Sequence, residues 1–415
     1  MGAAYRTITE DEHAAVAALI LHVGFGGTPP PEEYLRVAPP EQFRVLDDAG
    51  ELLSALRVSR LAQWWLGRAV PSAQVLHFAS PPQHRGQGHG SRLLAELLAE
   101  LREAGVPTAT LRPSNFPFYR AAGFEAAGAW SLYEARCEHL PKRLAPFRAR
   151  QVPIDDLAEP RALYQRIAPT RHGAFARDDL SWRWIARRAR DRSALCLVLD
   201  GPGALQVAPP DEPAGWVVVA FEFQRDAPVP TNHLQVLDWG CMPGADAALL
   251  ALLAGYSSMG GVLRWSGPDP DPALFALPDL HTRLVNRFHW MLRVVDLRAA
   301  FTARPYPAGV AGRVVLEVDD PVCPWNTGTW RLEVAGGGAG VERLAGGAAG
   351  VERVAGGGRG GALRTGARGL APLFTGFTDP ADLVRAGLLA PPGPDSLEFL
   401  RAAFASPRPW TAELY

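Results

Sequence analysis

The stretch from Val75 to Leu101, VLHFASPPQHRGQGHGSRLLAELLAEL, holds the residues whose spacing points most clearly to chemistry. Arg85, Gly88 and Gly90 fit the pattern R-x-x-G-x-G between an expected strand and an amphipathic helix. The first amides of a helix lack intrahelical acceptors and lie at the positive end of the helix dipole. Glycine lets a phosphate approach such amides closely. The turn is therefore predicted to bind a pyrophosphate; a plain strand-to-helix turn is the alternative.

Two other phosphate-binding motifs are excluded by the surroundings of this turn. No Gly-Lys-Ser or Gly-Lys-Thr follows it, as a P-loop requires. The turn also comes after several expected strands, whereas a dinucleotide fingerprint follows the first strand of its domain.

A second motif lies in LRPSNFPFYRAAGFE, from Leu111 to Glu125. Phe118 and Tyr119 open an expected short helix that ends at Gly123. A phenol with a pKa of about 10 can donate a proton to a thiolate whose conjugate acid has a pKa of about 8.5. Tyr119 is therefore a candidate general acid, and packing of the short helix on a sheet is the alternative.

The elements that must position these residues fall into three segments, residues 1–147, 148–290 and 291–415. Each alternates expected strands with helices, so we expect an α/β (α+β) fold of mixed sheets. The first segment is expected to end in a strand at Phe124–Ala135, and the third to begin with one at Met291–Asp296.

A Gly-rich insertion at 335–369 interrupts the third segment. It contains a tandem duplication, GVERLAGGAA followed at once by GVERVAGGGR, at Gly340–Ala349 and Gly350–Arg359. An elongated loop or hairpin is the expected structure, and a binding role is the alternative.

The order of these features resembles the Eis (enhanced intracellular survival) acetyltransferases. The two motifs resemble a GNAT N-acetyltransferase domain. The second segment resembles a degenerate GNAT-like domain, because its corresponding junction, LDWGCMPGADAALLALL, has neither Arg nor GxG. The third, with CPWNTGTWRLEV, resembles a sterol-carrier-protein-like domain. The resemblance implies two tandem GNAT-like mixed-sheet domains plus a sterol-carrier-like domain, acetyl-CoA as co-substrate of the first, no CoA in the second, and a homohexamer.

The resemblance also implies roles for residues of the first segment. Tyr119 would protonate the departing CoA thiolate. The groups that would hold acetyl-CoA, from the pantetheine arm through the pyrophosphate to the thiol end, are Phe78, Ala79 and Ser80, then Arg85, Gly86, Gln87, Gly88, His89, Gly90 and Ser91, and finally Ser114 and Asn115. Arg85 is the only fixed positive charge of the turn, because Gly86 and Gln87 stand where such enzymes often carry Arg.

In the Eis enzymes the carboxylate of a C-terminal aromatic residue activates the acceptor amine. This chain ends FASPRPWTAELY, with Pro409 and Trp410 before a terminal Tyr415. A protonated amine cannot attack a thioester, so a base must remove its proton. The Tyr415 carboxylate is the expected base, and a frayed tail is the alternative.

The resemblance further suggests polyamine-like acceptors, either aminoglycosides or lysine side chains of peptides. Such cations require an acidic pocket, yet Phe25–Leu35 contains only the acids Glu32 and Glu33, with Glu413 near the terminus. Trp64 and Trp65 are candidate aromatic walls, with sheet packing as the alternative. We expect direct transfer in a ternary complex, because no Cys lies near Tyr119 in the sequence. The alternative function is a non-enzymatic lipid- or ligand-binding or assembly protein.

Composition excludes several other classes of protein. The net charge of −1 argues against a nucleic-acid partner. Four scattered Cys form no CxxC or Cys/His cluster, so no metal is expected. The longest apolar runs, such as Ala14–Leu21, are too short to span a bilayer, and the first residues do not resemble a signal peptide. The expected location is the cytoplasm.

Overall fold

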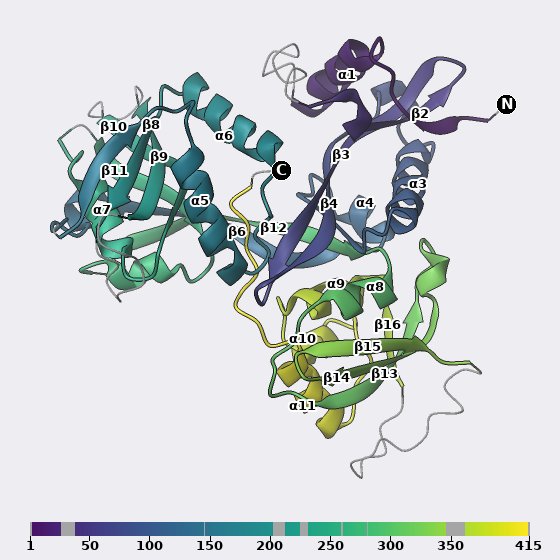
Figure 1. Cartoon of the computed structure of the whole chain (residues 1–415). Helices are drawn as coiled ribbons and strands as arrows, with labels where there is room; N and C mark the ends of the chain where they lie inside the picture. Colours follow the sequence, from purple (N-terminus) through teal and green to yellow (C-terminus); the bar gives the residue numbers. More distant parts are fainter. Residues whose placement is uncertain are drawn as a thin grey trace. The chain divides into compact units, whose positions relative to one another are not determined.

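A computed structural model describes residues 2–25, 38–144, 146–201, 212–224, 231–258, 260–279, 281–345 and 362–413. The chain forms two compact units (Figure 1). Unit 1 comprises residues 1–128, 289–409 and 413–415, and unit 2 comprises residues 129–288 and 410–412. The predicted domain boundaries at residues 147 and 290 remain a prediction. Most of the first segment and most of the third segment belong to the same compact unit, unit 1. None of the helices described has the length and apolar character needed to cross a bilayer.

The main sheet of unit 1 has the strand order β1-β2-β3-β4-β5-β12. All neighbours are antiparallel except the parallel pair β4 and β5. Its elements, in chain order, are β1 (Ala4–Thr7), α1 (His13–Phe25), β2 (Phe43–Asp48), β3 (Glu51–Trp65), β4 (Arg68–Ala79), α3 (His89–Glu103), β5 (Thr108–Leu111), α4 (Phe116–Ala121) and the end of β12 (Thr282–Val294).

Helix α3 forms the crossover connection that a parallel β4–β5 pair requires. Its buried side chains share one core with β2, β3 and β4 and are Leu93, Leu94, Leu97, Leu98 and Leu101. Gly105 follows the helix with φ +69 and donates its amide to the Arg102 carbonyl, as expected for a helix C-terminus. Helix α1 begins at His13, and just before it the Glu12 carboxylate accepts hydrogen bonds from the amide and hydroxyl of Thr9, a contact typical of a helix N-terminus.

Gly123 ends the helix that carries Tyr119, and only glycine fits there. Its φ is +83, and a Cβ would lie 2.8 Å from the Ala367 Cβ and 2.9 Å from the Arg293 guanidinium. Arg293 is fully buried and donates to both carboxylate oxygens of Asp320, at 2.6 and 2.7 Å. The glycine of the FYxxxGF motif thus lets the end of α4 pack against residues of the third segment.

The third segment adds a four-stranded sheet to unit 1, in the order β15-β14-β13-β16. Its buried residues form one hydrophobic cluster with Trp65 of β3, whose ring contacts Phe374 at 5.5 Å. Trp65 therefore packs in the core. The elements are α8 (Leu297–Ala303), β13 (Gly312–Asp319), β14 (Gly328–Ala335), β15 (Gly338–Arg343), β16 (Leu363–Gly366), α9 (Ala367–Thr375), α10 (Pro380–Arg385) and α11 (Pro394–Ala403).

The described ends of the Gly-rich stretch contain regular secondary structure. Gly336 and Gly337, both with positive φ, turn β14 into the antiparallel β15, so its beginning is the expected hairpin. β16 pairs in parallel with β13, and α9 follows it, so 363–369 belong to the domain framework rather than to a loop. Residues 346–361, including the second copy of the duplication, lie outside the described part.

Unit 2 has the strand order β6-β11-β10-β9-β8-β7 and, like unit 1, one parallel pair, β10 and β11, joined by a helix. Its elements are β6 (Glu125–Arg136), β7 (Arg148–Val152), α5 (Ala158–Ile167), α6 (Asp179–Asp191), β8 (Leu195–Asp200), β9 (Pro213–Gln224), β10 (Thr231–Cys241), α7 (Asp246–Ala254), β11 (Gly260–Gly267) and the beginning of β12. The mixed α/β fold class is confirmed.

Two expected strands have partners that the sequence did not indicate. β6, expected to close the first segment, pairs through Ser131–Arg136 with β11. β12, expected to open the third segment, pairs through Met291–Val294 with β5. Strand partners depend on tertiary packing of apolar faces, which the pattern of a single strand does not encode.

Candidate functional site

The strands β4 and β5 separate before β4 ends. Their parallel register runs from Ser72–Thr108 to Gln74–Thr110, and no pairing of these two strands follows among the described residues. β4 continues to Ala79, paired there only with β3 on its other side. His77 has φ +52, and the register of β4 with β3 is interrupted beside it, between Leu76 and Ala79. The end of β4 is therefore splayed from β5, with Phe78 within the irregularity.

The predicted turn follows this strand end and presents a row of backbone amides. After a short 3-10 turn at Pro82–His84, Gly88 adopts φ +84 and caps α3, which begins at His89. The amide of Arg92 is the first that bonds back, to the Gly88 carbonyl at 3.0 Å. Within the described part of the chain, the amides of residues 86–91 have no hydrogen-bond acceptor. Such amides at a helix N-terminus attract an anion.

The side chains of the turn are mostly exposed and fold back on the turn itself. Arg85 donates from Nε to the Ser80 carbonyl at 3.2 Å. Gln87 donates to the Gln83 carbonyl at 3.0 Å and contacts a ring nitrogen of His89 at 3.2 Å. The backbone amides of this turn are therefore better placed than its side chains to bind an anion.

Tyr119 is buried in a cluster of aromatic rings beside the turn. Its ring lies 5.0 Å from that of Phe118, 6.1 Å from Phe124 and 6.4 Å from Phe78 at the end of β4. Phe78 and Phe118 also contact each other, and a Cβ on Gly90 would lie within 3.4 Å of both rings. Phe118 was not predicted as a site residue, although its place in the FYxxxGF motif could have indicated it.

The Tyr119 phenol is held in its neutral form. Burial raises the pKa of Tyr119 to about 12, and a hydrogen bond with Ser114 opposes part of that rise. Ser114 is exposed, and the neighbouring Asn115 accepts the amide of Phe118 at 3.3 Å as the N-cap of α4. The structure thus gives Asn115 a helix-capping role and places Ser114 at the phenol.

The tail before the C-terminus is anchored within unit 2. Trp410 is buried, forms a parallel bridge with Ala129, and donates its amide to the His172 carbonyl at 2.9 Å. The Arg171 guanidinium lies 5.4 Å from the centre of the Trp410 ring, and Thr411 is almost fully buried. Tyr415, the expected base, lies outside the described residues.

Two further expectations concern the acceptor side. Glu32 and Glu33 also lie outside the described residues, so their placement stays a prediction. Glu413 is half-buried and Trp64 is partly exposed, which leaves Trp64 as the remaining candidate for an aromatic wall.

Comparisons with known proteins agree with this geometry. Residues 4–127 and 173–294 each match the acetyltransferase (GNAT) domain, and residues 297–412 match the sterol carrier protein domain. An uncharacterized N-acetyltransferase of Streptomyces coelicolor is 30% identical over 291 residues, which cover 67% of this chain and 68% of the relative. The chain belongs to the GNAT acetyltransferases. Its two GNAT domains and its sterol-carrier-like domain follow in the expected order.

Two solved structures resemble this protein over its whole length. A GCN5-related N-acetyltransferase from Kribbella flavida has a TM-score of 0.81 and 26% identity, covering 100% of this chain and 98% of the other. Eis1 from Mycobacterium abscessus has a TM-score of 0.79 and 21% identity, with full coverage of both chains. The likeness to Eis1 concerns the fold. The GNAT fold implies acetyl-CoA as co-substrate and an acceptor for the acetyl group.

Proposed function

We propose that this protein is an Eis-like, acetyl-CoA-dependent N-acetyltransferase that transfers the acetyl group directly to an amine in a ternary complex. One arrangement carries the proposal. The amides of residues 86–91 lack acceptors among the described residues, and they follow the strand end where β4 leaves β5. The buried phenol of Tyr119 contacts Phe78 of that same strand end. A pyrophosphate site, a slot between strands and a proton donor are the parts that thioester aminolysis requires.

Acetyl-CoA would bind along this line. The pyrophosphate would accept hydrogen bonds from the amides of Gly86, Gln87, Gly88, His89, Gly90 and Ser91, with Arg85 beside them. The pantetheine arm would lie against Phe78–Ser80. The Ala79 carbonyl already accepts a hydrogen bond from Ser54, and the Ser80 carbonyl accepts one from Arg85. Phe78 lies outside the β3–β4 register, so its main-chain groups are the best placed of the three to bind the pantetheine arm. Ser114 and Asn115 would flank the thiol end.

Tyr119 would assist departure of the thiolate. A neutral phenol can donate a hydrogen bond to the sulfur as negative charge develops on it, which stabilises the departing thiolate. A pKa of about 12 keeps the phenol protonated at any physiological pH. The Tyr415 carboxylate would remove the proton from the attacking amine, and the anchored Trp410 would limit the motion of the tail that carries it.

The cysteines favour direct transfer over an acyl-enzyme. Burial raises the pKa of Cys137 to about 11 and those of Cys196 and Cys323 to about 12, and it raises the pKa of Cys241 well above its usual value. The thiolate is the nucleophilic form of cysteine. Four protonated, largely buried thiols are poor candidates for an acetyl-cysteine intermediate.

The acceptor side of the proposal rests on the family resemblance. We propose polyamine-like acceptors, either aminoglycosides or lysine side chains of peptides, with Glu32, Glu33 and Glu413 supplying negative charge. A cytoplasmic homohexamer belongs to the same proposal.

The decisive experiment measures release of the CoA thiol from acetyl-CoA with a panel of aminoglycosides, polyamines and lysine peptides. Calorimetry with acetyl-CoA alone runs beside it. We expect binding of acetyl-CoA and thiol release with at least one amine. Absence of both would overturn the enzyme proposal and favour the non-enzymatic alternative.

Replacement of Gly88 tests the pyrophosphate site. At φ +84 an added methyl group costs about 1 kcal/mol of backbone strain and occupies open space beside the unpaired amides. We expect Gly88→Ala to raise the KM for acetyl-CoA about tenfold or more, measured by steady-state kinetics.

Gly105→Ala is the matched control for this prediction. Gly105 has φ +69, also faces open space, and follows the opposite end of the same helix. It carries the same backbone penalty without touching the turn. Equal effects of the two variants on KM would show that the change reports strain and not phosphate binding.

The pH profile tests the protonation state of Tyr119. A general acid acts in its protonated form. The part of kcat that depends on Tyr119 should therefore fall only when the pH rises through the pKa of its phenol. Because burial raises that pKa to about 12, we expect no loss of kcat assignable to Tyr119 between pH 8 and about 10. A fall of kcat in that range in the wild type that is absent in Tyr119→Phe would contradict the prediction.

A further inference from the structure

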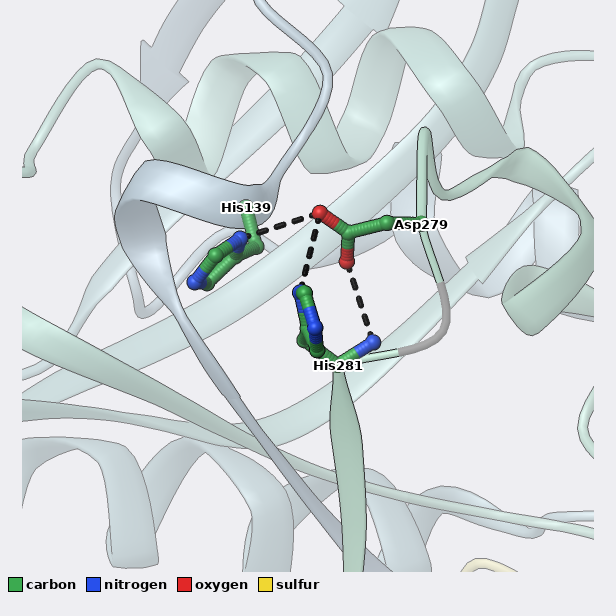
Figure 2. Close-up of side chains that lie close together, drawn as sticks. All are labelled: His139, Asp279 and His281. Atoms are coloured by element: carbon green, nitrogen blue, oxygen red, sulfur yellow. Dashed lines mark hydrogen bonds and ion pairs between the residues drawn. The ribbon is translucent and has the colours of Figure 1, made fainter.

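Three side chains of unit 2 that the proposed reaction does not use converge at one point. Figure 2 shows His139, Asp279 and His281 turned toward one another. His139 lies in the short 3-10 turn Cys137–His139 that follows β6, and His281 directly precedes β12. His139 and Asp279 are 140 positions apart in the chain, so no local spacing could indicate the cluster.

The geometry of the three groups is that of ligands around one small ion. Nδ1 of His139 lies 3.0 Å and Nδ1 of His281 lies 3.3 Å from the same carboxylate oxygen, Oδ2 of Asp279. One ligating atom from each residue can be chosen so that all three lie within 4.8 Å. Two ligands of a tetrahedral zinc ion with bonds of about 2.0–2.1 Å lie about 3.3–3.4 Å apart. Small rotations of the two imidazole rings would therefore bring both ring nitrogens and the carboxylate oxygen to ligand distance from one metal ion.

Other polar groups lie beside two of these three side chains. The other carboxylate oxygen of Asp279 accepts the His281 amide at 3.0 Å, which fixes the orientation of the carboxylate. Oε1 of Glu138 accepts a hydrogen bond from Arg136 at 2.6 Å and lies 3.6 Å from Nε2 of His139, the ring nitrogen that faces away from Asp279, so a small movement would bring it within hydrogen-bond distance. Metal-bound histidines usually donate their second ring nitrogen to such a carboxylate.

We propose that His139, Asp279 and His281 form a binding site for a divalent transition metal, with zinc as the best fit. Two imidazoles and one carboxylate suit zinc, and the partial exposure of the cluster leaves room for water as a fourth ligand. The bound metal ties the turn after β6 to the beginning of β12, two elements far apart in the chain. Its role is structural, and Glu138 is a positioning residue for His139.

Calorimetry of the untagged full-length protein with zinc chloride tests the site. We expect one zinc ion per chain and a higher thermal unfolding midpoint with zinc than with a chelator. Bound cobalt should give visible absorption of a nitrogen- and oxygen-ligated tetrahedral ion.

Variants separate this site from adventitious surface binding. We expect the double variant His139→Ala/His281→Ala to weaken zinc binding on the order of 100-fold, and the single variant Asp279→Asn to do the same. Glu138→Gln should weaken zinc binding about tenfold. His22→Ala, which removes an exposed histidine of α1, is the control and should leave affinity and stoichiometry unchanged. Absence of stoichiometric binding by the wild type, or unchanged binding by the double variant, would overturn the proposal and leave a plain hydrogen-bonded His–Asp–His cluster.

Discussion

Tyr119→Phe is expected to lower kcat about 100- to 1000-fold while changing the KM for acetyl-CoA little. The substitution keeps the ring that packs on Phe78, Phe118 and Phe124 and removes only the hydroxyl. Loss of a general acid typically costs this much, because the leaving thiolate must then depart without a positioned donor. Steady-state kinetics with a saturating amine, together with calorimetry for acetyl-CoA, gives the two quantities separately.

The control for this variant removes a phenol elsewhere. Tyr256 packs its ring on Phe221 at 5.5 Å in unit 2, so Tyr256→Phe should leave both kinetic parameters unchanged. A kcat for Tyr119→Phe within about threefold of the wild type would mean that Tyr119 only packs α4 on the sheet. In that case the acetyl-CoA site could still be correct, because the Gly88 variant tests it independently.

Removal of Tyr415 is expected to lower turnover about 100-fold and to leave acetyl-CoA binding unchanged. The deletion displaces the terminal carboxylate by one residue, so it no longer reaches the proton of the amine. Extension of the chain by one glycine should act in the same way. Thiol release at fixed pH and calorimetry with acetyl-CoA measure the two effects.

Tyr415→Phe is the matched control, because it keeps both the aromatic ring and the terminal carboxylate. We expect this variant to retain most of the wild-type turnover. Equal losses in Tyr415→Phe and in the deletion would indicate a role for the phenol or for tail packing. Full activity of the deletion would assign the base to another group.

Local features of the site could be predicted from the sequence because their causes are local. The leucine stripe of α3, the glycines of the turn and the asparagine before α4 act within a few residues of themselves. Membership of the GNAT acetyltransferases could be predicted for the same reason, since the GNAT motifs are short. The secondary structure of the Gly-rich stretch was harder to predict, because β15 and β16 are strands only through their pairing with β14 and β13.

The sequence by itself determined the fold class, the glycine-containing turn before α3 and the aromatic pair formed by Phe118 and Tyr119. Only the tertiary structure decided what depends on distant partners. It assigned β6 to β11 and β12 to β5, enclosed Tyr119 among three rings, anchored Trp410 beside Arg171 and His172, and joined His139 to Asp279 and His281. Periodicity and turn chemistry are properties of neighbours in the chain, whereas strand partners, burial and ligand clusters arise where segments far apart in the chain meet.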